Sequence, residues 1–234
     1  MDPNEILHVA PELRNIVALI VGGVPVAEIV KAILVPPAQV IGKRMADRVD
    51  RLFEKTGKMV LESGVSPQPV EDKLLVEIVR GASVEDNEDL HTMWAALLAN
   101  AASPEHAERV RPGFVAILNQ MAPDEARLLN WTHDHSQGWT QQLGGLKWVE
   151  AQAELGFTSK KEADTNPRIN SRMAACLDSL EAANLIRRNY YLPSTHDLNV
   201  GAEKFGYRDV AFRITITERG DTFIAACRPP YPKT

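Results

Sequence analysis

The densest group of side chains that could do chemistry is a run of four carboxylates within five residues, Glu85, Asp86, Glu88 and Asp89. Carboxylate oxygens are the ligands that hard cations such as Ca²⁺ prefer, so the run could bind a metal ion. The same residues also open an apolar helical pattern, where the helix dipole favours negative charge. We favour the helix-start interpretation, with Ser83 as the N-terminal cap, and predict no metal.

A second group of potential ligands is His133, Asp134 and His135. Histidines two positions apart point to different sides of a helix, and no third ligand follows at a spacing typical of zinc sites. We therefore interpret these three residues as the end of a helix.

The two cysteines, Cys176 and Cys227, lie far apart and have no CxxC partner, which is typical of a reduced intracellular protein. We expect both in the core, because the sequence places no histidine or cation where it would lower a thiol pKa. A Ser/His/Asp order, a glycine-rich phosphate loop and an HExxH motif are all missing from the sequence. We predict no enzymatic activity, no cofactor and no small-molecule substrate, and keep a hydrolase with scattered carboxylates as the least favoured alternative.

The formal charge of -5 is unevenly placed, since residues 1–122 carry 12 Lys+Arg against 17 Asp+Glu and residues 123–234 carry 14 of each. Neither half resembles a strongly basic nucleic-acid binder, whose phosphate contacts need clustered Lys and Arg. At the N-terminus Asp2 and Glu5 come before any apolar stretch, so we expect no signal peptide and a cytoplasmic protein.

The element around which the chain is organised is a predicted helix over 83–102, whose large apolar residues recur every three or four positions on one face. Packing should decide its formation, because burying a large side chain contributes about 1.5–3 kcal/mol and a cap about 1 kcal/mol. Together with the next apolar stripe, this helix supplies the expected core: Leu90, Trp94, Leu97, Leu98, Phe114 and Leu118.

Other helical patterns surround this element. Amphipathic spacing predicts helices over 37–63 and 70–81, the second ending at Gly81 in a left-handed turn, and further helices from Phe114 and from Pro123. We predict a mainly α protein with an N-terminal multi-helix bundle in residues 1–122. A winged-helix-like α+β domain should follow in residues 123–234.

Residues 15–42 contain only two charged side chains, Glu28 and Lys31. A membrane span needs about 20 consecutive apolar residues, whereas glycines and prolines interrupt this run. We prefer two short buried helices that meet at 22–25, in the core or at a subunit interface, over insertion into a bilayer. Engagement of a membrane by this segment stays an open alternative.

The last hundred residues combine helix and strand patterns. A strong helix over 169–184 precedes two extended runs at 185–192 and 210–217, and a short helix then ends near Cys227. This is the order of a winged helix, in which the start of the recognition helix meets DNA or another partner. The candidate contact residues are Arg168, Asn170, Ser171 and Arg172.

Two observations weigh against DNA as the partner. The expected wing, residues 193–209, is not basic, and Asp178 and Glu181 share the surface of the predicted recognition helix. Phosphate contacts would need an excess of cations here. We therefore prefer a protein contact or a scaffold role for this end of the chain.

The sequence resembles the Abi-alpha family, the abortive-infection alpha proteins of bacteria. The resemblance spans about residues 36–227 and rests on packing residues, which are Asp89, Leu90, Trp94, Leu97, Leu98, Ala99, Asn100, Phe114, Ile117, Leu118, Met121, Pro123, Asp124, Ala126, Leu129, Leu180, Leu185, Ile186, Thr217, Gly220, Phe223 and Cys227. The resemblance implies antiphage defence by growth arrest or death of the infected cell, and it implies no catalytic residues.

These observations favour a non-enzymatic antiphage protein that acts through protein contacts, either with a partner or with itself. The alternative is a winged-helix transcriptional regulator that binds DNA. A membrane is the less favoured target, and the trigger, the cellular target and the oligomeric state stay open.

Overall fold

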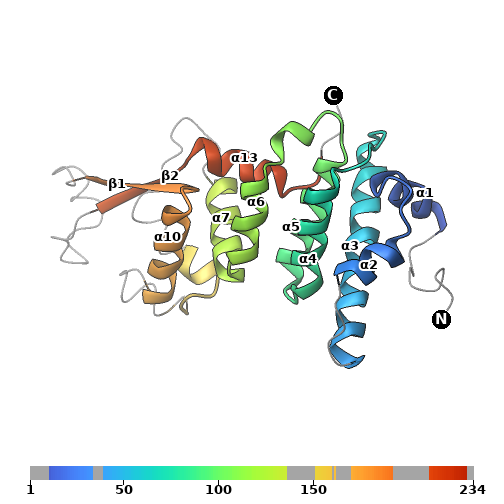
Figure 1. Cartoon of the computed structure of the whole chain (residues 1–234). Coiled ribbons are helices and arrows are strands. Elements are labelled where there is room, and N and C mark those ends of the chain that lie inside the picture. The colour runs from blue at the N-terminus through green and yellow to red at the C-terminus, as the bar shows by residue number, and fades with distance from the viewer. Residues whose placement is uncertain are drawn as a thin grey trace. The chain divides into compact units, whose positions relative to one another are not determined.

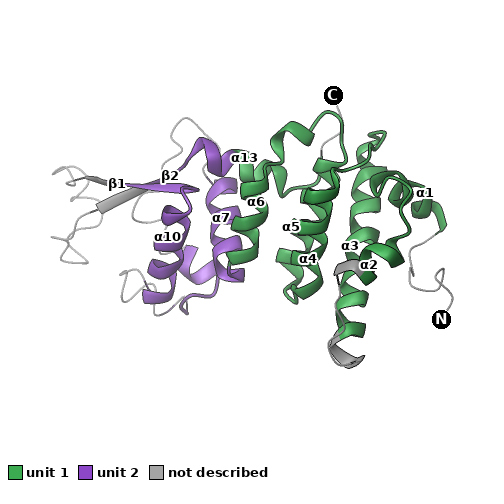
Figure 2. Cartoon of the chain, in the orientation of Figure 1, with its two compact units in different colours: residues 1–121, 222–234 green, residues 122–221 purple. Residues whose placement is uncertain are grey.

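The computed structural model of the chain describes residues 11–33, 39–135, 151–159, 161, 170–191 and 211–230. Within these ranges the protein is mainly helical and has one two-stranded sheet, so the predicted α class is confirmed. Packing divides the chain into two compact units, residues 1–121 with 222–234 and residues 122–221 (Figure 2). The expected domains, 1–122 and 123–234, stay a prediction, and residues 222–234 pack in the first unit although we had placed them in the second domain.

The first unit is built from helices that pack side by side (Figure 1). Its elements are α1 (Pro11–Ile20), α2 (Val26–Ile33), α3 (Gln39–Ser63), α4 (Asp72–Val84), α5 (Glu88–Ala101), the 3-10 helix η1 (Ala107–Arg109), α6 (Pro112–Gln120) and the last part of α13 (Glu218–Ala226).

The core of this unit surrounds α5, which packs against α3, α4 and η1. From Leu90 to Ala101 every residue except Thr92 is buried, so the helix is enclosed almost all round rather than on the one predicted face. Ala95, Ala96 and Ala99 have small side chains, which let the neighbouring segments approach α5 closely. The six expected core residues, Leu90, Trp94, Leu97, Leu98, Phe114 and Leu118, are each at most 2% exposed.

The predicted start of the central helix is wrong. Ser83 lies inside α4, where its hydroxyl donates a hydrogen bond of 2.8 Å to the Arg80 carbonyl. Asn87 is the true cap of α5, because its side-chain oxygen accepts from the backbone N–H groups of Asp89 and Leu90, both at 3.1 Å.

The predicted end of the preceding helix is also wrong, since α4 continues past Gly81 to Val84. Gly81 is buried, and a Cβ added there would lie 2.5 Å from the Trp94 ring and 2.9 Å from Asn119 Oδ1. The glycine therefore provides the space in which Trp94 packs, and it does not terminate the helix.

Asn100 joins the end of the chain to the core helix. The amide is 1% exposed, and its Nδ2 lies 2.9 Å from the Ala96 carbonyl, 3.0 Å from that of Ala226 and 2.8 Å from that of Arg228. Nearby, the Phe223 ring meets Phe114 edge to face, with centroids 5.4 Å apart. Residues 126 positions apart in sequence are thereby held together in one unit.

The apolar segment near the N-terminus forms two short helices, α1 and α2, that meet at 21–25, which confirms the prediction of a helix pair. Gly22 and Gly23 make the turn with φ of 63° and 81°, a left-handed conformation that glycine adopts without steric cost. Among the residues that the structure describes, no helix has both the length and the apolar character needed to cross a bilayer.

The second unit contains α7 (Pro123–His135), α10 (Ser171–Ala182) and the antiparallel strands β1 (Ile186–Tyr191) and β2 (Ala211–Ile216), with helical residues also at 151–154. Ile186 pairs with Ile216 and Arg188 with Ile214. At the start of α13, a Cβ on Gly220 would lie 2.1 Å from the Leu185 carbonyl oxygen, so only glycine fits there. The winged-helix-like arrangement stays a prediction, because the expected wing at 193–209 lies outside the described residues.

We expect Gly81→Ala to lower the free energy of unfolding by about 1–3 kcal/mol, the usual cost of overpacking. The clash with Trp94 should outweigh the higher helix propensity of alanine, which is worth about 1 kcal/mol. Urea denaturation measures the change. Because phenylalanine is shorter, the same substitution should cost less in a Trp94→Phe background, and equal costs in the two backgrounds would contradict the packing explanation.

Candidate functional site

The start of α10, where we expected a partner contact, is organised by hydrogen bonds within the second unit. Asn170 caps the helix by accepting from the Arg172 backbone N–H at 2.8 Å. The Asn170 backbone N–H in turn donates to Gln152 Oε1 at 2.5 Å. Ser171 is exposed, whereas Arg168 lies outside the described residues. The described candidates therefore lie side by side at one helix end.

The guanidinium group of Arg172 is paired within the protein. Its Nε lies 2.5 Å from Asp124 Oδ2, and its Cζ lies 5.2 Å from the centre of the Phe157 ring. The hydrogen bond from Arg172 lowers the pKa of Asp124, and the same contact raises the pKa of Arg172. Arg127, one helical turn along α7, also pairs with Asp124. The Arg172–Asp124 pair thus joins the starts of α7 and α10. Because Asp124 partly neutralises the charge of Arg172, the guanidinium group would attract an external phosphate less strongly.

In the hairpin that follows α10, an arginine again pairs with acidic side chains of a neighbouring element. Arg188 Nη2 lies 2.6 Å from Asp178 Oδ1 and 2.6 Å from Glu181 Oε2. A hydrogen bond from the Arg188 backbone N–H also contributes to the lowered pKa of Glu181. The two acids that we had counted against DNA binding therefore hold strand β1 against α10.

A polar cluster that the sequence analysis did not identify lies between α3 and α5 in the first unit. Lys55 Nζ lies 2.6 Å from Glu88 Oε1 and donates to Thr92 Oγ1 at 2.7 Å, and Arg51 lies 3.5 Å from the other Glu88 oxygen. The Lys55 hydrogen bond lowers the pKa of Glu88. The sequence offered only a weak signal for this cluster, the basic positions repeated along α3, because the acid lies on another helix.

His91 is the buried member of this cluster, with 1% of its surface exposed. Its Nε2 lies 3.0 Å from the Arg48 carbonyl, and since a carbonyl only accepts, Nε2 carries the hydrogen. Nδ1 then presents a lone pair and has no hydrogen-bond partner among the described residues. Burial lowers the pKa of His91, so the folded protein favours the neutral ring.

The other residues singled out in the sequence do not gather into a site. In the acidic run, Glu85 accepts from the Asn87 backbone N–H at 2.8 Å and Asp86 is exposed. His135 stacks on Trp131 with ring centres 4.1 Å apart. Within the described ranges, no three His, Cys, Asp or Glu side chains converge as metal ligands would.

Neither cysteine has the environment of a nucleophile. Both thiols are buried and neither forms a disulfide, and burial raises the pKa of Cys176 and of Cys227. A raised pKa keeps a thiol protonated at neutral pH, whereas a nucleophilic cysteine needs the thiolate.

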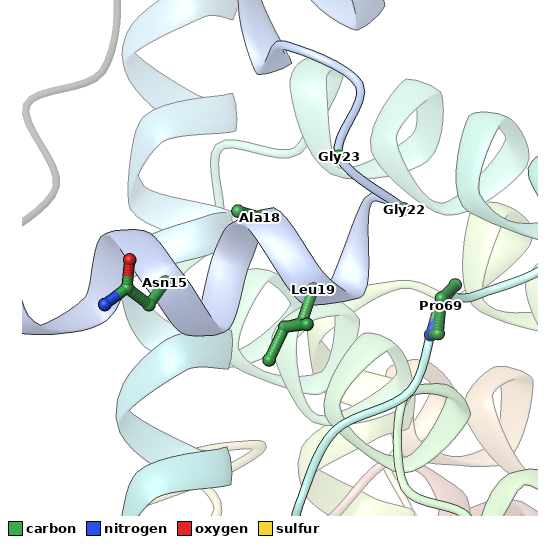
Figure 3. A pocket seen from close by; sticks show the side chains of 6 residues that line it. All are labelled: Asn15, Ala18, Leu19, Gly22, Gly23 and Pro69. Atoms are coloured by element: carbon green, nitrogen blue, oxygen red, sulfur yellow. The ribbon is translucent and has the colours of Figure 1, made fainter.

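An open apolar pocket of about 530 Å³ lies beside the end of α1 in the first unit (Figure 3). Its lining is formed by Asn15, Ala18, Leu19, Gly22, Gly23 and Pro69. None of these six residues is charged, and among them Asn15 alone has a polar side chain. The pocket therefore offers an apolar contact surface rather than groups for acid–base chemistry.

The described residues form a mainly helical protein in which the charged side chains of each cluster pair with one another. A family model described as abortive infection alpha matches residues 39–227, from the first residue of α3 to Cys227. The chain belongs to the abortive infection alpha family, which confirms the resemblance drawn from its packing residues. Comparison with curated proteins gives no match, and comparison with solved structures gives none either.

We expect the stability of the protein to fall as the pH drops below about 6.5, the ordinary pKa of histidine in an unfolded chain. Because the folded state lowers the pKa of His91, the unfolded state takes up the proton first, and stability is lost until the folded pKa is reached. Urea denaturation at several pH values measures the slope. His91→Gln should flatten it just below about pH 6.5, and an unchanged slope would show that another group is responsible.

Proposed function

We propose that this protein acts in antiphage defence by abortive infection, in which an infected cell stops growing or dies before phage is released. The observation that carries the proposal is the family match over residues 39–227, which includes the core of both compact units. The family description names the process and leaves the molecular action open.

We further propose that the action is a contact with another macromolecule rather than catalysis. The support is the way the ionisable clusters are used: Glu88 pairs with Lys55, Asp124 with Arg172 and Glu181 with Arg188. Each pair fixes the position of two elements of the fold. A catalytic group, by contrast, needs its proton or lone pair directed at a substrate.

The second unit is proposed to have a winged-helix-like arrangement that presents the contact surface. Helix α10 followed by the β1–β2 hairpin agrees with this arrangement, and Ser171 at the exposed start of α10 marks the surface. The partner that best fits the paired charges is a protein surface.

A phage-challenge experiment tests the defence role. Cells that express the full chain should release fewer phage per infected cell than empty-vector cells, and the infected cells should not recover. A culture infected at low multiplicity should survive, while one infected at high multiplicity should collapse. Unchanged phage yield would contradict the role, and so would infected cells that survive and divide.

Isosteric variants test the absence of catalysis. Glu88→Gln and Asp124→Asn each remove an acid while keeping the shape of the side chain, and His91→Gln replaces the basic ring with an uncharged polar side chain. If the protein acts by contact, each variant that keeps its circular dichroism spectrum should still protect cells. Trp94→Ala, which empties the core, is the matched control for loss of the fold and should not protect. Loss of protection in a well-folded isosteric variant would argue for chemistry at that group.

The regulator alternative predicts a different result. DNA binding through the start of α10 should weaken steeply as salt rises, and loss of the Arg172 contact should reduce the slope of log affinity against log salt by about 1. We expect no such binding, because Arg172 already pairs with Asp124, which partly neutralises its charge. Low-salt duplex binding that is weakened by Arg172→Ala, and strengthened by Asp124→Asn, would replace the protein-contact proposal with the regulator.

A further inference from the structure

The beginning of α3 is held less firmly than the rest of the helix. Helix α3 has 25 residues, whereas α4 has 13 and α5 has 14, and its beginning reaches past both neighbours (Figure 1). We call residues 42–48 the projecting segment. None of its residues is buried, and Val49 is the first buried residue among those of α3 whose burial the structure describes.

Two hydrogen bonds of Arg48 join the projecting segment to other helices. Its Nη1 donates to the Ser83 carbonyl of α4 at 3.4 Å, and its carbonyl accepts from His91 Nε2 of α5 at 3.0 Å. His91 therefore lies at the point where the projecting segment meets the body of the unit.

The surroundings of His91 accommodate a neutral ring and oppose a protonated one. The residue is 1% exposed, and Nδ1 has no hydrogen-bond partner among the described residues. Uptake of a proton would place a hydrogen on Nδ1 with no acceptor, and a buried donor without a partner loses the hydrogen bonds that it makes to water. The positive charge would likewise be removed from water.

The charged groups around the ring add to this opposition. On α3, Lys55 and Arg51 place two cations near it, and only Glu88 of α5 favours the proton. Glu88 is already engaged, since its two oxygens lie 2.6 Å from Lys55 Nζ and 3.5 Å from Arg51 Nη1. The charged residues of α4, the other long helix packed on α5, act less on the ring; they are Asp72, Lys73, Glu77 and Arg80.

Water offers a protonated His91 what the fold does not, an acceptor for Nδ1 and solvation of the charge. The projecting segment can move away from α5 without exposing a buried side chain of its own, so water can reach the ring from this end of α3. We propose that His91 is a pH-sensitive switch: when its ring takes up a proton, the projecting segment separates from the start of α5 while the rest of the unit stays folded. This goes beyond the proposed defence role and does not depend on it.

Hydrogen exchange of the full chain tests the proposal. The backbone N–H groups of residues 46–52 donate to the carbonyls of 42–48 in a regular helix, so opening of the projecting segment exposes them. After correction for the intrinsic effect of pH on exchange, their protection should fall by up to about tenfold for each pH unit below about 6.5. The reason is that the open state binds the proton at the ordinary pKa of histidine.

Helix α6 serves as the reference for global unfolding. Exchange at 46–52 should be faster than in α6 and should respond less to added urea, because a local opening exposes little surface. Equal rates and equal urea dependence at the two places would overturn the proposal, since they would show that α3 opens only when the whole unit unfolds. Protection at 46–52 that does not change with pH would overturn it as well.

Three variants assign the effect to His91. His91→Gln should remove the loss of protection at low pH, and an undiminished loss would contradict the proposal. Lys55→Met should lessen the loss, because one cation fewer opposes the proton in the closed state. Lys58→Met, the matched control, removes an exposed cation of the same helix that pairs with Glu54 and should leave the loss unchanged.

The lysine pair also separates a switch from a merely structural contact. Loss of the Lys55 hydrogen bonds alone would raise exchange equally at pH 7.5 and pH 5.5, whereas removal of its charge should change the dependence on pH. The comparison of Lys55→Met with Lys58→Met decides the question if His91→Gln does not fold. The same pH dependence in both lysine variants would then reject the switch.

Discussion

Burial of α5 around nearly its whole circumference is the constraint on which the first unit depends. A helix enclosed on several sides needs small residues where neighbours approach, and Ala95, Ala96 and Ala99 meet that need. The buried Asn100 amide donates hydrogen bonds to a carbonyl of its own helix and to the carbonyls of Ala226 and Arg228. Trp94 fills the space that Gly81 leaves on α4. Packing and hydrogen bonding thus agree on one arrangement.

The charged groups of the protein serve the same purpose in a different way. Lys55 with Glu88 and Arg172 with Asp124 join helices that are distant in sequence, and Arg188 with Glu181 joins strand β1 to the helix before it. Exposed pairs of this kind contribute little to stability individually, because water and salt screen them. Their effect is to determine which elements of the fold lie against each other.

Family membership and the structure contribute different information about function. Membership in the abortive infection alpha family covers α3 to the end of α13 and connects the chain with phage defence. The structure adds that α1–α2 lies outside the match yet is packed on the body through Leu13 and Gly57.

The sequence by itself determined the helical class, the position of the main helices and the six-residue core, because apolar spacing of three to four residues is a local property of the chain. It also indicated the family, since that resemblance rests on packing residues. Ser83, by contrast, looked like a cap by its local pattern, yet packing extended α4 through it and left Asn87 to begin α5. Gly81 matched the local pattern of a helix end, but in the structure Trp94 packs into the space that its missing side chain leaves.

Only the tertiary structure decided the role of the charges. Arg172 carries the same sequence signal whether it faces DNA or Asp124, which lies 48 positions away. His91 shows nothing unusual in sequence, and its low pKa arises from burial against α3. The requirement for glycine at position 220 likewise comes from the Leu185 carbonyl. Local patterns encode which segments are helices, but the partner of a charge or the neighbour of a glycine is set by segments that meet only after folding.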